Sequence, residues 1–392
     1  MTSLLALPLN TAATCCATCT SYCACKTLSS SCELSITTSR FIYLAFLFIS
    51  IILAILLQNF GQPIYIDIEY SFFQYKHTLC PYQCMGTEIV YRISIALTTF
   101  YILMSLLTST ISTFSTNAQT KYWVLKFTFL TSLITLSPLL PQEFIISWSI
   151  LCRYASILFM LIQMCILIDF GYTLNNKLVS YDGILWESCI ILISIGLYVA
   201  MIIMICTIYS NITYGILVLS GNVLMTAISI SPIAPHGTLI TSGIVTFQIA
   251  YYYLIGYQAS SHINTLLGGF FTALSLTFTA YSTSKTNVFH YNSIDNVNEL
   301  MLLDSKIILD EESQVVLPHE QNDNQIKKNE NVVSGFYHIT LALSSMYMPI
   351  LLIGFDDNNS IHTEIIVSQI FGALLYTWTL IAPTLFPNRD FD

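Results

Sequence analysis

Charged residues are scarce in this chain. Lys, Arg, Asp and Glu make up only 9% of its 392 residues, whereas a soluble globular protein has about 25%. This scarcity excludes a soluble multidomain enzyme. Basic residues are the scarcer sign, with 13 Lys and Arg against 22 Asp and Glu and a net charge of −9. Nucleic-acid-binding proteins carry a basic patch or stripe, so no nucleic-acid partner is expected.

Signatures of catalysis and cofactor binding are missing as well. The sequence contains no Gly-x-Ser-x-Gly, no His-Glu-x-x-His, no phosphate-binding loop and no dinucleotide fingerprint. It therefore predicts a protein that is not an enzyme and that uses no cofactor and no bound metal. The first 25 residues also lack Lys and Arg, so they do not have the positive start of a cleavable signal peptide. We expect the N-terminus to be retained.

Hydrophobic residues, in contrast, are abundant. They make up 55% of the chain, which is enough for about ten spans of about 20 apolar residues each. The apolar runs are continuous and do not alternate in polarity as the strands of a membrane barrel do. We therefore predict an all-α membrane protein with about ten transmembrane helices, at residues 40–60, 88–113, 121–140, 145–170, 185–209, 212–231, 237–257, 263–283, 334–354 and 363–386.

The distribution of basic residues predicts the orientation. With ten spans and a cytoplasmic N-terminus, the C-terminus is cytoplasmic too, and the outside loops contain only Lys76. Arg92 and Arg153 then lie in the outer thirds of their helices. The inside segments hold the other basic residues, which are Lys26, Arg40, Lys121, Lys126, Lys177, Lys285, Lys306, Lys327, Lys328 and Arg389. Such a bias agrees with the positive-inside rule.

One segment differs in composition from the rest. Residues 284–333 contain nine acids and four lysines among many Asn and Ser, and such a segment cannot bury enough apolar surface to offset its ordering entropy. We expect a disordered cytoplasmic loop that is either a linker or a regulatory or sorting segment, because Met301 to Leu303 lie among acids as in dileucine signals. The predicted parts are a cysteine-rich cytoplasmic segment (1–39), helices one to eight (40–283), the acidic loop (284–333), and helices nine and ten with a short tail (334–392).

The cysteines and sequons suggest modifications. Five cysteines crowd the N-terminal segment, where palmitoylation near the inner membrane surface and simple packing against the membrane are the two interpretations; they are Cys15, Cys16, Cys19, Cys23 and Cys25. Their spacing, with no nearby His, is poor for a metal site. Cys80 and Cys84 fall in an outer loop, where they either form a disulfide or stay unpaired. Asn358 is the better of two glycosylation sequons.

Polar residues inside the predicted spans are the best indication of function, because a charge in hydrocarbon is unfavourable by several kcal/mol unless it is paired or meets water. The candidates for a lipid or headgroup track are Arg153, Gln163 and Asp169 in the fourth span, with Asn222 and Gln248 in the sixth and seventh. The alternatives are that the charged residues, with Arg92, Lys126 and Glu187, reach the headgroups at the interfaces, and that the amides bond to neighbouring helices. His338 is interpreted as a hydrogen-bonded helix residue and not as a ligand.

Several stretches in the same order resemble the serine incorporator family. They run from residue 15 to the end of the chain and comprise Cys15 to Cys25, Thr38 to Tyr43, Cys84 to Arg92, Tyr122 to Phe127, Leu161 to Phe170, Val297 to Asp304 and Tyr376 to Asp392. The resemblance implies two helical bundles joined by a long diagonal helix, which would be the fourth span. It also implies a role in serine supply for phosphatidylserine and sphingolipid synthesis and in ATP-independent phospholipid scrambling.

The partners expected from this resemblance are membrane lipids, both phospholipids and sphingolipids, together with serine and further copies of the chain in a homo-oligomer. The expected location is the plasma membrane or the endomembranes of the ER and Golgi. Two other classes stay open. A secondary transporter of a small polar solute would have a closed midplane site, often between repeated halves, and the sequence shows no convincing repeat. A structural scaffold without transport is the third interpretation.

Overall fold

The computed structural model describes residues 35–60, 82–110, 119–181, 183–207, 212–232, 234, 237–257, 265–283, 319–353 and 360–385. These residues fold almost entirely into α-helices, and no strand occurs in these ranges. The prediction of an all-α fold is confirmed. The cysteines 15, 16, 19, 23, 25 and 80, the sequon at Asn358 and the loop 284–318 lie outside the described residues, so those predictions stay untested.

Each predicted span overlaps one helix. The helices are α2 (Ile36–Phe60), α4 (Tyr82–Thr110), α6 (Trp123–Leu136) with the 3-10 turn η1 (Ser137–Leu139), α7 (Gln142–Val179), α8 (Ile184–Cys206), α9 (Ile212–Ile230), α10 (Leu239–Tyr257), a helix over 265–283, α12 (His319–Ile353) and α13 (Ser360–Leu385). Seven of them, namely α2, α4, α7, α8, α9, α12 and α13, are long and apolar enough to cross a membrane, and α6 and α10 are shorter apolar helices. The chain is therefore a multi-pass membrane protein.

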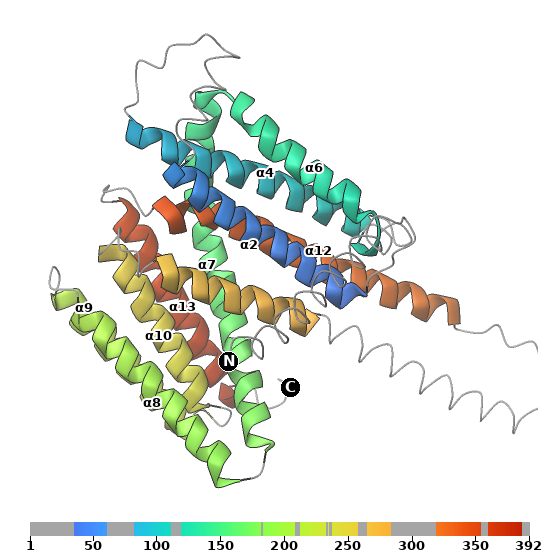
Figure 1. Cartoon of the computed structure of the whole chain (residues 1–392). Coiled ribbons are helices and arrows are strands. Elements are labelled where there is room, and N and C mark those ends of the chain that lie inside the picture. The colour runs from blue at the N-terminus through green and yellow to red at the C-terminus, as the bar shows by residue number, and fades with distance from the viewer. Residues whose placement is uncertain are drawn as a thin grey trace, which may run out of the picture.

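The helices form two bundles (Figure 1). The first bundle contains α2, α4, α6 and α12, and the second contains α8, α9, α10 and α13. Among the labelled helices, extensive contacts occur within a bundle or with α7, which crosses both. The 265–283 helix also joins the bundles, because Thr265 donates a hydrogen bond to the Leu351 carbonyl of α12 at 3.3 Å while the Phe271 ring lies 5.2 Å from that of Tyr251 in α10.

Helix α7 is the long diagonal helix of the fold. It has 38 residues, so it is about 57 Å long at 1.5 Å per residue, against a hydrocarbon core of about 30 Å. Pro141 precedes it in an extended conformation, and Gly183 with φ of 146° follows it. The predicted end at residue 170 was wrong by nine residues, because the helix continues beyond the apolar run through the polar residues Asn175, Asn176 and Lys177.

The start of α12 corrects the predicted boundary at residue 334. The helix begins at His319, so residues 319–333 are helical and not a disordered part of the acidic loop. The segment contains Glu, Gln and Lys, which have high helix propensity. Extending an existing helix fixes one residue for each hydrogen bond gained and avoids a new nucleus. The packed, apolar part of α12 therefore provides the nucleus, and the polar residues 319–333 continue the helix from it.

Candidate functional site

Two buried glutamines meet where α7 packs against α10. The exposed fractions of Gln163 and Gln248 are 1% and 0%, and Nε2 of Gln248 donates to Oε1 of Gln163 at 3.4 Å. Among the described residues, Gln163 Nε2 and Gln248 Oε1 have no hydrogen-bond partner. One helical turn away, Tyr252 donates to the Met160 carbonyl at 3.0 Å. This buried amide pair, 85 residues apart in sequence, links the diagonal helix to the second bundle.

Asn222 lies elsewhere in the second bundle. Its Nδ2 is 3.5 Å from the Thr246 carbonyl, at the contact of α9 with α10. Thr246 and Gln248 are two residues apart, and at about 100° per residue they face nearly opposite sides of α10. Asn222 therefore does not join Gln163 in a continuous track, and its contact is a helix-to-helix hydrogen bond of the kind that membrane bundles use.

The two charged candidates on α7 are also separate from each other. Arg153 is half-buried and Asp169 is exposed. The 16 residues between them correspond to about 24 Å along the helix and about 160° around it. The predicted track of five residues is thus divided in the structure: Gln163 and Gln248 come together, whereas Arg153, Asp169 and Asn222 each lie apart.

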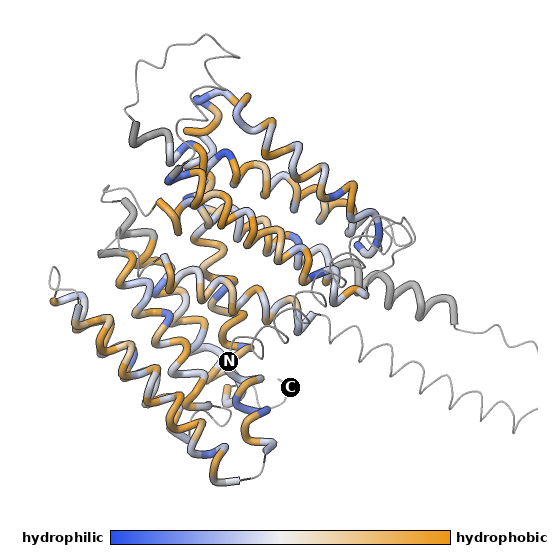
Figure 2. The backbone as a smooth tube through the Cα atoms, in the orientation of Figure 1, coloured by the Kyte–Doolittle hydropathy of each residue, from blue (hydrophilic) through white to orange (hydrophobic). Residues whose placement is uncertain are grey.

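Asp169 instead belongs to a polar stripe on the exposed face of α7. We define the α7 polar stripe as Cys165, Asp169, Thr173 and Asn176, all four of which are exposed. Their spacing of four, four and three residues places them on one helix face. The exposed residues preceding them on this face are apolar, namely Leu151, Tyr154 and Leu158. Hydrophilic residues accordingly gather at the lower end of α7 (Figure 2).

Three side chains of this stripe have polar groups without a partner in the part of the chain that the structure describes. Within the described ranges, no hydrogen bond or ion pair involves the Asp169 carboxylate, the Thr173 hydroxyl or the Asn176 amide. Exposed threonines of α6 behave differently, since Thr128 and Thr135 donate to carbonyls one turn earlier at 2.9 and 3.0 Å. The stripe therefore offers unused polar groups on the outer surface of a membrane-spanning helix.

Three basic side chains gather in the first bundle, which the sequence did not indicate. Arg40, Lys126 and His338 are 2%, 7% and 2% exposed, so Lys126 does not reach the interface as expected. Its Nζ donates to the Gln119 carbonyl at 2.9 Å and lies 3.9 Å from the centre of the Trp123 ring.

The other two members of this cluster also have protein contacts. Arg40 Nη2 donates to Ser334 Oγ at 3.2 Å. The His338 ring packs edge-on against Tyr43 at 4.6 Å, and its Nδ1 has no hydrogen-bond partner among the described residues. The expectation of a hydrogen-bonded histidine was therefore wrong for this nitrogen, because aromatic rings surround it. Within the described ranges, no three His, Cys, Asp or Glu side chains come together as metal ligands.

Arg92 does not reach the outer headgroups either. It is 2% exposed, and its Nη1 donates to the carbonyl oxygens of Ser137, Pro138 and Leu140 at 3.0, 2.7 and 3.0 Å. These carbonyls belong to the turn η1 and to Leu140, which follow α6, and the Ser137 carbonyl also accepts from the Leu140 N–H at 3.2 Å. Glu88 lies 3.6 Å from Arg92 Nη2. The role of Arg92 is thus to hold the connection between α6 and α7.

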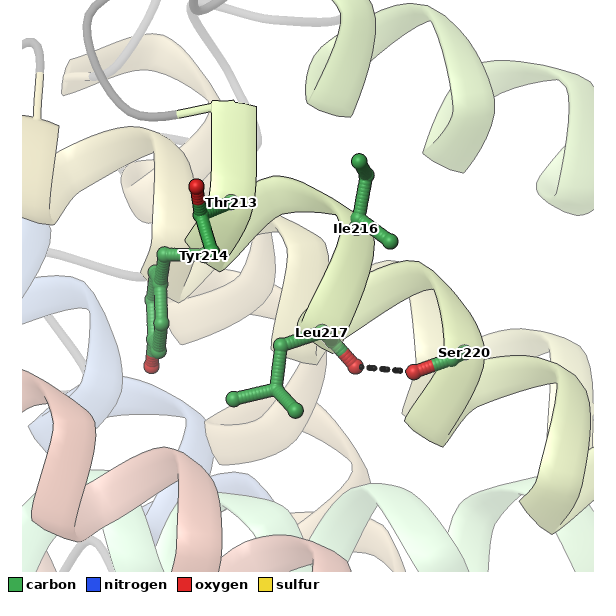
Figure 3. Close-up of a pocket in the computed structure, with 5 residues that line it drawn as sticks. All are labelled: Thr213, Tyr214, Ile216, Leu217 and Ser220. Carbon is green, nitrogen blue, oxygen red and sulfur yellow. Dashed lines mark hydrogen bonds between the residues drawn. The ribbon is translucent and has the colours of Figure 1, made fainter.

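A shallow pocket lies on α9 (Figure 3). It has a volume of about 360 Å³ and is lined by Thr213, Tyr214, Ile216, Leu217 and Ser220. Two of its three polar side chains are engaged within the protein, because Tyr214 donates to Gln369 Oε1 and Ser220 donates to the Leu217 carbonyl at 2.9 Å. Ile216 and Leu217 are 62% and 64% exposed. The surface offered here is mainly apolar, in contrast to the α7 polar stripe.

Comparison with known proteins assigns the family. The model of the serine incorporator (Serinc) family matches residues 13–389. A probable serine incorporator of Dictyostelium discoideum is 24% identical and aligns with 79% of this chain and 85% of the relative. One of Nematostella vectensis is 23% identical over 91% of both chains, and serine incorporator 2 of Bos taurus is 24% identical over 79% of this chain and 80% of the relative. The chain belongs to the serine incorporator family.

Proposed function

We propose that this protein is a non-enzymatic carrier of phospholipids, which lets headgroups pass between leaflets without ATP and supports the incorporation of serine into phosphatidylserine and sphingolipids. Membership of the serine incorporator family supports this role. The observation that carries the proposal is the α7 polar stripe, whose exposed polar groups have no partner among the described residues. A helix surface of this kind lowers the barrier for a polar headgroup while the acyl chains stay in lipid.

The stripe covers part of the membrane. Cys165 and Asn176 are 11 residues apart, which is about 17 Å of helix, or roughly half of the 30 Å hydrocarbon core. A headgroup entering at the C-terminal end of α7 would meet polar groups as far as Cys165. Beyond this point the exposed face is apolar from Leu158 to Leu151, and this part of the path has the main remaining barrier.

The orientation is part of the proposal. With both termini in the cytoplasm, the C-terminal end of α7 and its stripe face the cytoplasmic leaflet of the plasma membrane or of the ER and Golgi. Protease protection of terminal tags in sealed cells tests this. Tags that are cleaved from outside would reverse the leaflet that the stripe serves.

The test of lipid movement uses purified protein in liposomes that contain phospholipids labelled on an acyl chain, with a membrane-impermeant quencher added outside. The double variant Thr173→Val and Asn176→Leu removes two donors of the stripe, and we expect scrambling to slow by several fold. Thr128→Val is the matched control, because its exposed hydroxyl is already bonded within α6. Equal rates for the double variant and the wild type would contradict the proposed path.

The second candidate function is a secondary transporter of a small polar solute. The buried amide pair favours it, because Gln163 Nε2 and Gln248 Oε1 offer a donor and an acceptor away from water. This function predicts saturable serine uptake into vesicles, abolished by Gln163→Leu or Gln248→Leu in protein that still folds. Lipid scrambling without serine uptake would eliminate it.

A further inference from the structure

We infer that Asp169 binds the ammonium group of a headgroup that enters the α7 polar stripe. The inference rests on the proposed function and names the lipid class, which is phospholipids with an amine or a quaternary ammonium group. Free serine shares this ammonium chemistry. The structural basis is an exposed carboxylate inside a membrane-spanning helix, with no partner among the described residues.

Three other carboxylates of the described helices have stabilising surroundings. Glu143 and Glu187 lie in the first turns of α7 and α8, where the helix dipole favours a negative charge. Glu88 accepts a hydrogen bond from Gln142 at 3.0 Å and lies near Arg92. Asp169 lies ten residues before the end of α7 at Val179 and has neither advantage. Of these four carboxylates, Asp169 is the one for which the described residues provide no stabilising partner.

Electrostatics selects the ligand. A carboxylate facing lipid is strongly unfavourable unless water or an opposite charge reaches it, so the favoured ligand is a cation. The phosphate of a headgroup alone would be repelled. An ammonium group supplies the positive charge together with charge-assisted hydrogen bonds, which are the stronger kind, or, when it is fully methylated, the charge alone.

The spacing along the stripe fits a zwitterionic headgroup. In such a headgroup four bonds separate the amine nitrogen from the phosphorus, and this extended length is slightly shorter than the 5.4 Å rise of one helical turn. Thr173 lies one turn beyond Asp169 towards the end of α7, and the exposed Asn176 and Lys177 follow. With the ammonium at Asp169, the hydroxyl, amide and ammonium donors of these residues face the phosphate. The amine would thus lead the headgroup into the membrane.

The experiment compares two lipids in the same liposomes: acyl-labelled phosphatidylethanolamine, which has an ammonium group, and acyl-labelled phosphatidylglycerol, which has none. Asp169→Asn should slow scrambling of phosphatidylethanolamine by about tenfold, the loss of one charge-assisted hydrogen bond, and leave phosphatidylglycerol unchanged or faster. Asp169→Glu should restore the preference. Glu143→Gln, which removes an exposed carboxylate from the first turn of the same helix, is the control and should behave as wild type.

A binding measurement separates this inference from the proposed function. Native mass spectrometry of the detergent-solubilised protein should show retention of phosphatidylethanolamine over phosphatidylglycerol in the wild type and loss of this preference in Asp169→Asn. A parallel sample with free L-serine and phosphatidylglycerol identifies the source of the ammonium group: retained serine assigns the site to the free amino acid, and retained phosphatidylethanolamine assigns it to the headgroup.

The outcomes are distinct. A binding preference for phosphatidylethanolamine in a protein that scrambles no lipid would contradict the proposed function and support the ammonium site. Scrambling in the wild type with Asp169→Asn slowing both lipids equally, or neither, would overturn the ammonium site and keep the proposed function. Loss of retention of both lipids alike in Asp169→Asn would also overturn it, since it would indicate a general defect.

Discussion

Nη1 of Arg92 lies 2.7 Å from the carbonyl oxygen of Pro138. The guanidinium group therefore holds the end of α6 from a neighbouring helix, α4, and fixes the turn from which the diagonal helix starts. Arg92 is almost completely buried, and a buried charge is tolerated only where hydrogen bonds satisfy it. Arg92 is therefore a structural residue, and its replacement should lower the stability of the protein measurably.

Arg92→Leu should lower the free energy of unfolding by about 3 kcal/mol, because it leaves one buried and two partly buried carbonyls without their charged donor. Arg92→Lys keeps the charge but not the fork of donors, so it should lose about half as much. The measurement is thermal or denaturant unfolding in detergent. Arg153→Leu is the control and should change stability little, since Arg153 is half-buried and has no hydrogen bond or ion pair within the described ranges. Equal loss in both variants would contradict the assignment.

Lys126→Met should destabilise the first bundle by about 1 to 2 kcal/mol. The substitution removes the hydrogen bond to the Gln119 carbonyl and the cation–π contact with Trp123, each of which contributes about 1 kcal/mol. Lys177→Met, at the exposed end of α7, is the matched control and should unfold as wild type does. A Lys126→Met protein as stable as this control would show that the cluster is held by packing alone.

Gly171→Ala should loosen the contact of α7 with α10. A methyl group at this position would lie 2.9 Å from Thr241 Oγ1 and 3.0 Å from its Cα, and the backbone cannot move away without separating the helices. We expect a loss of about 1 to 3 kcal/mol, as for overpacked cores. Gly221→Ala on α9, where nothing lies within 4 Å, should be neutral. The measurement is the unfolding temperature of each variant in detergent. An unchanged unfolding temperature for Gly171→Ala would show that the contact between α7 and α10 has room for a methyl group.

The buried amide pair should have a small coupling energy. In a double-mutant cycle of Gln163→Leu and Gln248→Leu, we expect about 0.6 kcal/mol, the average for hydrogen bonds inside membrane bundles. The 3.4 Å separation of the two amides agrees with a weak bond. Unfolding in detergent gives the four stabilities. A coupling above about 2 kcal/mol would indicate a network with additional members.

Much of the fold could be predicted from apolar length alone, because each predicted span overlaps one helix. The ends could not. The interval 145–170 stopped where the apolar run stops, yet α7 continues to Val179. This error concealed the α7 polar stripe, since Thr173 and Asn176 fell outside the predicted helix. Their spacing from Asp169 was a usable signal that a longer helix would have revealed.

The contacts between helices were beyond sequence reasoning. Gln163 and Gln248 are 85 residues apart, and periodicity does not tell which helices face each other. The same holds for the cluster of Arg40, Lys126 and His338, which comes from three helices. An interface position was the alternative given for Lys126, because a buried cation is unfavourable, and Arg40 was expected in an inside segment. Carbonyls, hydroxyls and aromatic rings from neighbouring segments make that burial acceptable, and none of these partners is visible in a local stretch of sequence.

The order of the helices along the chain has a consequence for biosynthesis. The first bundle receives α2, α4 and α6 early, but its fourth member, α12, is synthesised only after α8, α9 and α10 of the other bundle. Arg40 must therefore wait for its partner Ser334, 294 residues downstream. The second bundle is likewise completed by the final helix, α13. Neither bundle can be completed before synthesis of the chain has nearly finished. A nascent chain that stalls after residue 283 therefore leaves both bundles incomplete, and polar side chains that are buried in the complete fold would face lipid or the insertion machinery.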